Sequence, residues 1–286
     1  MNFRRILTLG LVAGAVGACG DDDGPTGIEP IGGVRFVNVL PDTVALDFRV
    51  IRPTITHTPQ SLEHEFREFS QHWPVAVGTH EVRAFFSGLD SRDEDDVQIV
   101  IAEAEPSFTQ GVNRSVVAMG FARDGQTPAM EVLITDDTPP ERVDGQYHLR
   151  VLHAGAGLPA MNVYVRPSGD PNPATATIAD VAYGEVTAYV GLPVVRSADE
   201  ESDTLEVVAV PVGGGAEIVA KLPLGSEGNV STEGSAGTRF AGGALTILIT
   251  PPTVAGSRAP QDTPPDDTFS NPAIVILSDR RTPMTQ

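Results

Sequence analysis

Short segments rich in valine, isoleucine and threonine recur along the chain, and each is bounded by Gly, Pro, Asp or Ser. Segments of this length and composition are typical of β-strands, and long apolar patterns at helical spacing are nearly absent. The pattern therefore predicts an all-β fold. The strand candidates are residues 34–39, 97–102, 116–121, 130–135, 149–154, 205–211, 245–250 and 273–277.

One motif occurs twice along the chain. Residues 34–39 align on residues 149–154 without a gap, and residues 47–50 align on residues 162–165 at the same offset of 115. Self-similarity of this kind indicates repeated structural units. Later matches pair residues 66–70 with 183–187 at an offset of 117, residues 81–85 with 206–210 at an offset of 125, and the closing segments 130–139 and 273–283.

The repeat predicts two homologous domains, residues 33–139 and residues 147–284. About seven strand-length segments with many short turns in each copy fit two tandem β-sandwiches of immunoglobulin-like architecture. The cysteine pair and tryptophan of true immunoglobulin domains are missing, so only the architecture is expected. Proline-rich residues 251–272 have few apolar side chains, and we expect them to form a flexible, disordered insertion in the second domain.

Residues 61–72 carry conflicting signals. Leu62, Phe66 and Phe69 lie at i, i+4 and i+7, which is the spacing of an amphipathic helix. The aligned residues 181–190 are rich in β-branched and aromatic side chains, which pack better on a pleated surface. Because homologous copies share structure, we predict strands in both segments.

The first 23 residues resemble a bacterial lipoprotein signal. Arg4 and Arg5 precede an apolar run, residues 6–16, that is too short to span a bilayer, and small residues precede Cys19, the only cysteine in the chain. We expect residues 1–18 to be a signal peptide and Cys19 to carry the lipid anchor. Residues 19–32 would form a flexible tether, and the protein would be held in the bacterial cell envelope, at the outer membrane or the cell surface.

Charge limits the partners of this chain. Removing residues 1–18 takes away two arginines, which leaves 17 basic against 38 acidic residues and moves the formal charge from −19 to −21. A field of this sign repels phosphate backbones and anionic headgroups, so nucleic acid is excluded as a partner. Once Cys19 is acylated, no thiol remains for a disulfide, and stability depends on packing or bound ions.

Several segments in the second copy are similar to a known family. Residues 149–154, 161–165, 181–184 and 189–193 resemble the pattern Arg-Val-x-His-Ala, Val-Asp-Val-Tyr, Tyr-Gly and Tyr-x-x-Leu-Pro of domain of unknown function 4397. The first copy departs by having Asn38 in place of the histidine. The resemblance implies an exported bacterial protein or lipoprotein, in which such domains often occur in tandem and have no established activity.

No nucleophile elbow, P-loop, dinucleotide fingerprint or zincin motif is present in the sequence. His57, His64, His72 and His80 follow one another at intervals of 7, 8 and 8 residues, so a zinc site would need neighbouring strands to gather them. Scattered surface or half-buried histidines are the favoured alternative. His153 is interpreted as a hydrogen-bonded strand residue rather than a catalytic base.

Two acidic clusters are candidates for calcium binding, because hard oxygen ligands in loops suit that ion. Neither cluster has an EF-hand pattern, and solvated charged loops are the favoured alternative, so no cofactor is expected apart from this candidate calcium. The candidate ligands are Asp90, Asp93, Asp95 and Asp96 in the first copy, and Asp199, Glu200 and Asp203 in the second.

Two classes of function remain open. The favoured one is a non-catalytic, lipid-anchored binding or structural module for an envelope protein or glycan, since ligands of sandwich proteins commonly bind to loops. The alternative is a hydrolase that acts on glycans through scattered carboxylates. The polar residues shared by the copies are interpreted as structural ions within strands, and they pair Arg35 with Arg150, Glu68 with Glu185, and Glu81 with Glu206.

The lipid anchor can be tested by Cys19→Ser. The substitution removes the thiol that would carry the lipid, so we expect incorporation of a fatty-acid probe to fall to background and the protein to leave the membrane fraction. Metabolic labelling followed by fractionation measures both effects. Undiminished labelling of the variant would contradict the lipoprotein interpretation.

Overall fold

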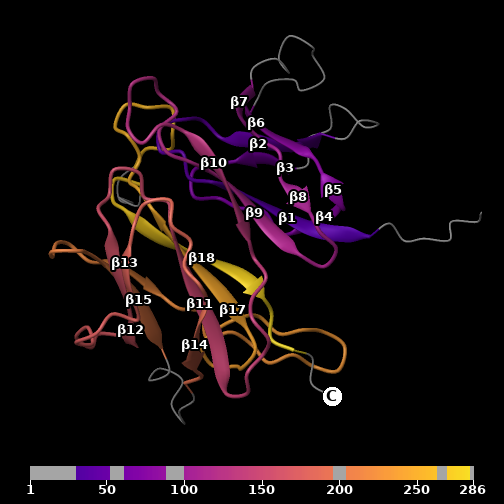
Figure 1. Ribbon diagram of the computed structural model, residues 1–286. Helices are drawn as coiled ribbons and strands as arrows, with labels where there is room; N and C mark the ends of the chain where they lie inside the picture. The colour runs from indigo at the N-terminus through magenta and orange to yellow at the C-terminus, as the bar shows by residue number, and fades with distance from the viewer. Residues whose placement is uncertain (1–29, 52–60, 88–99, 196–203, 263–268, 284–286) are drawn as a thin grey trace, which may run out of the picture.

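The computed structural model describes residues 30–51, 61–87, 100–195, 204–262 and 269–283 (Figure 1). All regular elements in these ranges are β-strands, as the sequence predicted, and none of the described segments forms a helix able to cross a membrane. The first half contains β1 (Ile31–Asn38), β2 (Leu46–Ile51), β3 (Ser61–His64), β4 (Trp73–Ala76), β5 (Gly78–Thr79), β6 (Glu81–Phe86), β7 (Val100–Ala104), β8 (Ser107–Phe108), β9 (Asn113–Met119) and β10 (Glu131–Asp136). The second half contains β11 (Gln146–His153), β12 (Met161–Pro167), β13 (Ile178–Val181), β14 (Val190–Pro193), β15 (Leu205–Pro211), β16 (Ile218–Lys221), β17 (Ala244–Thr250) and β18 (Ala273–Arg280).

The two halves have sheets of the same strand order. In the first half the sheets are β10-β9-β1-β4 and β3-β2-β6-β7, with a small β5-β8 pair, and in the second they are β18-β17-β11-β14 and β13-β12-β15-β16. The central pairs, β1 with β9 and β11 with β17, are parallel, and the other pairs are antiparallel. Each half is therefore consistent with a β-sandwich.

The strand registers place residues that match in the sequence repeat at equivalent positions in the two halves. Val37 lies opposite Val117 in the parallel pair of the first half, and Leu152 lies opposite Leu248 in that of the second. Antiparallel bridges at Phe69 and at residue 186 complete the same pattern. The pairs Phe48↔Ala84 and Val163↔Ala209 likewise correspond, at offsets of 115 and 125.

The central sheet of each half is buried on both faces. Alternate residues of β1, such as Val34 and Phe36, pack in the core of their own half, whereas Val37 and Val39 point toward the other half. Strands β1, β11 and β17 are buried along almost their whole length, and polar residues such as Arg35, Arg150 and His153 are buried with the apolar ones.

The two central sheets pack face to face and form an apolar layer, which we call the inter-half layer. Strands β9 and β10 of the first half and β11 and β18 of the second accordingly lie near one another in the middle of the molecule (Figure 1). The molecule is thus four sheets deep, and the halves share a core. The buried members of the layer are Val37, Val39, Phe66, Val117, Met119, Leu152, Ala154, Leu248 and Leu277.

The prediction of continuous strands over residues 61–72 and 181–190 is wrong in part. The segments begin with β3 and β13, but each then forms a turn whose third residue, Arg67 or Gly184, has a positive φ of 70° or 79°. Leu62, Phe66 and Phe69 therefore have the spacing of a helix without forming one. The turn places Phe66 in the inter-half layer and leaves Leu62 exposed.

The sequence analysis interpreted Glu68 and Glu185 as structural ions within strands, and this interpretation is wrong. Each lies in this turn and accepts a hydrogen bond from a backbone N–H three residues earlier, of Glu65 at 2.9 Å and of Ala182 at 3.0 Å. The carboxylates close equivalent turns, because a turn leaves donors that no sheet ladder can satisfy. Their shared role is local backbone geometry.

The segment 251–272 also differs from the flexible insertion that we predicted, in those parts that lie within the described residues. Arg67 of the first half donates hydrogen bonds to the carbonyl oxygens of Pro251 at 2.8 Å and Asn271 at 2.5 Å. Its guanidinium lies 5.8 Å from the ring of Phe269, and the N–H of Val254 donates to the carbonyl of Pro41 at 2.9 Å. The segment therefore packs against the first half, which its composition did not reveal.

A shared core predicts that the halves unfold together. Trp73, the only tryptophan, lies in the first half, so its fluorescence reports on that half alone. Met161→Ala creates a cavity in the core of the second half and should cost about 2–5 kcal/mol. We expect the Trp73 midpoint in urea to fall together with that of circular dichroism.

The control is Val219→Ala, at a position that is 46% exposed on β16, and it should leave both midpoints unchanged. A Trp73 transition that stays at its original midpoint in Met161→Ala, while circular dichroism shows an earlier step, would contradict the shared core.

Candidate binding groove between the two halves

A cluster of four buried charges lies at one end of the inter-half layer. Arg35 Nη2 donates to Asp137 Oδ2 at 3.0 Å and across the junction to Asp279 Oδ1 at 2.8 Å. Arg150 Nη2 of the second half lies 2.5 Å from Asp137 Oδ1. Each half thus supplies one arginine and one aspartate, and each arginine binds the aspartate of the other half.

A hydroxyl group joins the charges within each half. The hydroxyl of Ser115 accepts from Nε of Arg35 at 2.9 Å and donates to Asp137 at 2.5 Å. Thr246 holds the corresponding place in the second half, where the two distances are 2.8 Å and 2.5 Å. The cluster therefore has approximate twofold symmetry, as an interface between two copies of one surface would have.

One further side chain completes each side. His72 Nε2 lies 3.1 Å from Asp137, and the hydroxyl of Tyr189 donates to Asp279 at 2.9 Å. These two residues correspond at the offset of 117 that relates the preceding turns. Burial and the neighbouring Asp279 carboxylate raise the pKa of Tyr189 above its usual range, so this hydroxyl remains a donor.

The surroundings keep Asp137 ionised. Burial alone would raise the pKa of its carboxyl, because a low dielectric disfavours charge. Hydrogen bonds from His72 and Ser115 oppose this effect, as do the positive charges of Arg35 and Arg150. Together they hold the pKa of Asp137 well below its usual range.

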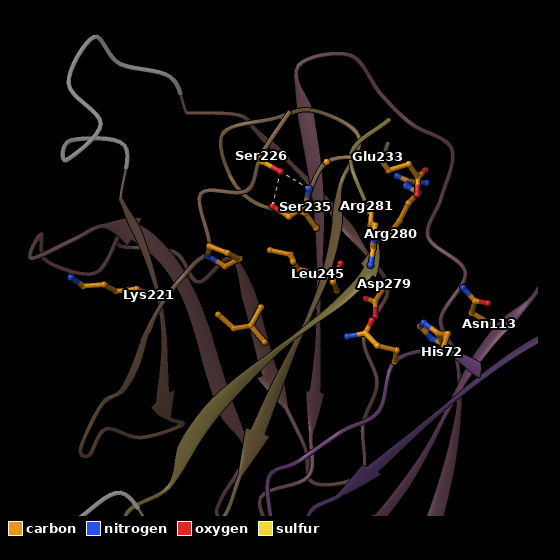
Figure 2. A pocket seen from close by; sticks show the side chains of 16 residues that line it. His72, Asn113, Lys221, Ser226, Glu233, Ser235, Leu245, Asp279, Arg280 and Arg281 are labelled. Atoms are coloured by element: carbon orange, nitrogen blue, oxygen red, sulfur yellow. Dashed lines mark hydrogen bonds between the residues drawn. The ribbon is translucent and has the colours of Figure 1, made fainter. Parts of the chain in front are cut away.

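An open groove of about 1120 Å³ adjoins the cluster (Figure 2). Strand β18 crosses it, with Lys221 at one end and the first-half residues His72 and Asn113 at the other. Both halves therefore build the groove. Its lining consists of Gln71, His72, Asn113, Lys221, Pro223, Ser226, Glu233, Gly234, Ser235, Ala236, Leu245, Ile276, Ser278, Asp279, Arg280 and Arg281.

Three cations in the groove have no carboxylate partner among the described residues. Lys221 and Arg281 are exposed, and Arg280 donates to the carbonyls of Gly242 at 2.8 Å and Pro140 at 2.5 Å. Burial lowers the pKa of Arg280. The guanidinium nevertheless stays charged, because arginine is not deprotonated in proteins. The groove is consequently a basic site on an acidic protein.

The two carboxylates of the lining are already engaged. Glu233 lies 3.5 Å from Arg142 Nη2, and Asp279 belongs to the buried cluster. The hydroxyls of Ser226 and Ser235 hydrogen-bond each other at 3.0 Å. Within the described ranges neither hydroxyl has a histidine or carboxylate beside it, which a nucleophilic mechanism would require. The arrangement supports binding.

Most of the site residues that the sequence predicted fall outside the described residues. These are Cys19 and all the calcium candidates, Asp90, Asp93, Asp95, Asp96, Asp199, Glu200 and Asp203. In the parts of the chain that are described, no three His, Cys, Asp or Glu side chains gather in a way that could hold a metal.

The histidines considered for zinc have separate partners where they are described. His64 hydrogen-bonds Ser61, His72 contacts the buried cluster, and His80 Nε2 lies 3.0 Å from the carbonyl of Ala76. His57 lies outside the described residues. His153 is fully buried in β11, where it accepts from the N–H of Gly155 at 3.1 Å, as the structural interpretation predicted.

The sequence analysis identified the arginines of the cluster but missed their aspartates. Asp137 and Asp279 lie within the closing segments of the two copies, so the signal was present. The strand registers relate β10 to β18 at an offset of 142, whereas aligning these segments from residues 130 and 273 uses an offset of 143 and pairs Asp136 with Asp279.

A protein-family model matches part of the chain. Residues 32–164 match the model of the domain of unknown function DUF4397, which covers the first half together with β11 and part of β12. The match therefore lies mainly in the first half, whereas the resemblance found in the sequence was stronger in the second copy. No curated protein sequence matches the chain.

Solved structures show a weak likeness. The chain is 12% identical to a family 41 carbohydrate-binding module from streptococcal virulence factors, described for alpha-glucan recognition, with a TM-score of 0.22 over 66% of this chain and 88% of that one. It is 10% identical to a "Putative cell adhesion protein" from Parabacteroides distasonis, with a TM-score of 0.21 over 87% and 99% of the two chains.

Asp137→Asn tests the buried cluster. Removing one charge leaves the arginines under-compensated, and we expect a loss of about 3–5 kcal/mol in the free energy of unfolding at neutral pH. Because the folded-state pKa is lowered, the ionised carboxylate stabilises the wild type above the unfolded pKa of about 3.9, and this contribution is lost as pH falls below that value.

The variant should therefore show a shallower decline of stability below about pH 4 than the wild type. Urea unfolding across pH 2 to 7 measures this, with Asp124→Asn, an exposed loop carboxylate, as the matched control. Parallel pH profiles for wild type and Asp137→Asn would show that the cluster does not stabilise the fold.

Proposed function

We propose that the protein is a lipid-anchored, non-catalytic binding module of the bacterial cell envelope. In this proposal residues 33–139 and 147–284 are tandem copies of one immunoglobulin-like β-sandwich of the DUF4397 type. The identical strand orders, corresponding registers and equivalent turns of the two halves support the duplication. The family match over residues 32–164 supports the assignment.

The observation that carries the proposal is the groove at the junction of the halves. It is polar, open and basic, it uses residues of both halves, and it lies beside the cluster that fixes the halves together. A rigid scaffold holds the lining in place before a ligand arrives, which lowers the entropic cost of binding.

The expected anchor suits a module that reaches outward. Cys19 would attach to the membrane through residues 19–32, and the acidic surface would keep the folded part away from anionic headgroups. The partner would be an envelope protein or glycan. The calcium candidates in residues 90–96 and 199–203 remain a separate proposal, to be tested by titrating calcium into the apo protein.

The hydrolase alternative has no specific observation in its favour. A glycosidase needs two carboxylates on either side of the scissile bond, one of them free to donate a proton. A glycan hydrolysis screen with Glu233→Gln as the paired variant tests this alternative directly. Turnover that disappears in the variant, with no change in melting temperature, would overturn the non-catalytic proposal.

Site-specific photocrosslinking in intact cells tests the groove. A photoreactive amino acid at Gln71, on the exposed rim, should yield a covalent adduct, whereas the same group at Val230, which is 81% exposed and outside the groove, should not. Combining the Gln71 probe with Lys221→Gln and Arg281→Gln should reduce the adduct several-fold. Equal adducts at both positions, or none at Gln71, would count against the groove as the binding site.

A further inference from the structure

Strand β18 lines the groove from Ile276 onward and is the outer strand of its sheet, with β16 of the other sheet lying beside part of it. The N–H of Ala154 donates to the carbonyl of Ile249 at 2.9 Å, so the backbone groups of Ile249 point toward β11. Since these groups alternate along a strand, Leu248 is among the residues of β17 that bond β18. Its register partner is Val275, and the N–H and C=O groups of Ile274 and Ile276 therefore point away from β17.

These outward groups have no backbone partner among the residues that the structure describes. Toward the end of the strand the edge is occupied, because the carbonyl of Ser278 accepts from Arg35 Nη1 at 3.2 Å and Gly234 bridges to Thr282. The free stretch is apolar and carries no charge or proline. Proteins usually block such an edge, because it is a template for another strand.

The side chains around this edge favour an acidic ligand. In a chain with 38 acidic and 19 basic residues, a cation would ordinarily find a carboxylate partner, yet Lys221, Arg280 and Arg281 have none within the described ranges. Distant negative charges are largely screened beyond about 8 Å at physiological salt, so these three cations dominate the local potential.

The lining also discriminates between classes of ligand. Among the described residues it contains no tryptophan, tyrosine or phenylalanine, and thus no flat aromatic side chain on which a sugar ring could stack. A free strand edge instead offers alternating N–H and C=O groups, which match the backbone of an extended peptide. The surroundings of Ile276 therefore favour a peptide over a glycan.

Resting on the proposed function of this groove, we propose that its ligand is an extended acidic peptide segment of a partner protein, which adds as a further strand to β18. Ile274 and Ile276 bond its backbone, and Lys221 and Arg281 bind its carboxylates. Figure 2 shows β18 running through the groove between these basic side chains and His72.

The test uses the purified full-length mature chain and a fluorescent eight-residue peptide in which glutamate alternates with threonine. We expect saturable binding by anisotropy that weakens as sodium chloride rises. Lys221→Gln combined with Arg281→Gln should weaken binding about fivefold or more, since each exposed charge pair contributes modestly. A peptide with lysine in place of glutamate should not bind.

Two measurements separate strand addition from simple attraction of an anion. Methylating alternate backbone nitrogens of the acidic peptide keeps its charge but removes its donors, and should abolish binding. Hydrogen exchange should show added protection of the amides of Ile274 and Ile276, with Val50 on β2 of the first half as an unaffected reference.

Equal binding of the methylated peptide, or of an acidic polysaccharide without a peptide backbone, would overturn strand addition and leave the groove as an anion site. If no acidic peptide binds while the Gln71 crosslink still forms, this inference fails and the proposed function stands. If neither signal is seen, both fail.

Discussion

The arrangement of this protein depends on two arginine–aspartate pairs exchanged between its halves. Charges removed from water cost several kcal/mol each unless they are paired and hydrogen-bonded. Arg35 bonds Asp137 of its own half and Asp279 of the other half, and Arg150 bonds Asp137 across the junction. Each half therefore completes the other, and the apolar layer beside the cluster is held in one orientation.

The fold was largely readable from the sequence, because its signals are local. The strand segments and the offsets of 115 and 125 record alternation and turn spacing, and the registers reproduce them. The mostly apolar sequence of residues 245–250 is typical of a strand that is buried on both faces, but it does not identify the part of the protein that covers each face. Burial against the other half is a long-range property that no single segment carries.

The site was harder to predict for the same reason. Arg35 and Arg150 were recognised as structural ions, but their aspartate partners lie at the ends of strands that are distant in sequence. The groove is assembled from separate stretches of both halves, so no motif spans it. Glu68 was misjudged because a carboxylate that closes a turn looks, in sequence, like one that faces a strand.

Arg67 makes the two ends of the inter-half layer unlike. Its backbone has the left-handed conformation that glycine adopts readily, and Gly184 holds the equivalent place in the other half. The first half accepts that conformational strain because the arginine side chain bonds the carbonyls of Pro251 and Asn271. The two halves are consequently not interchangeable at this turn, because the arginine of the first half depends on a segment that the second half supplies.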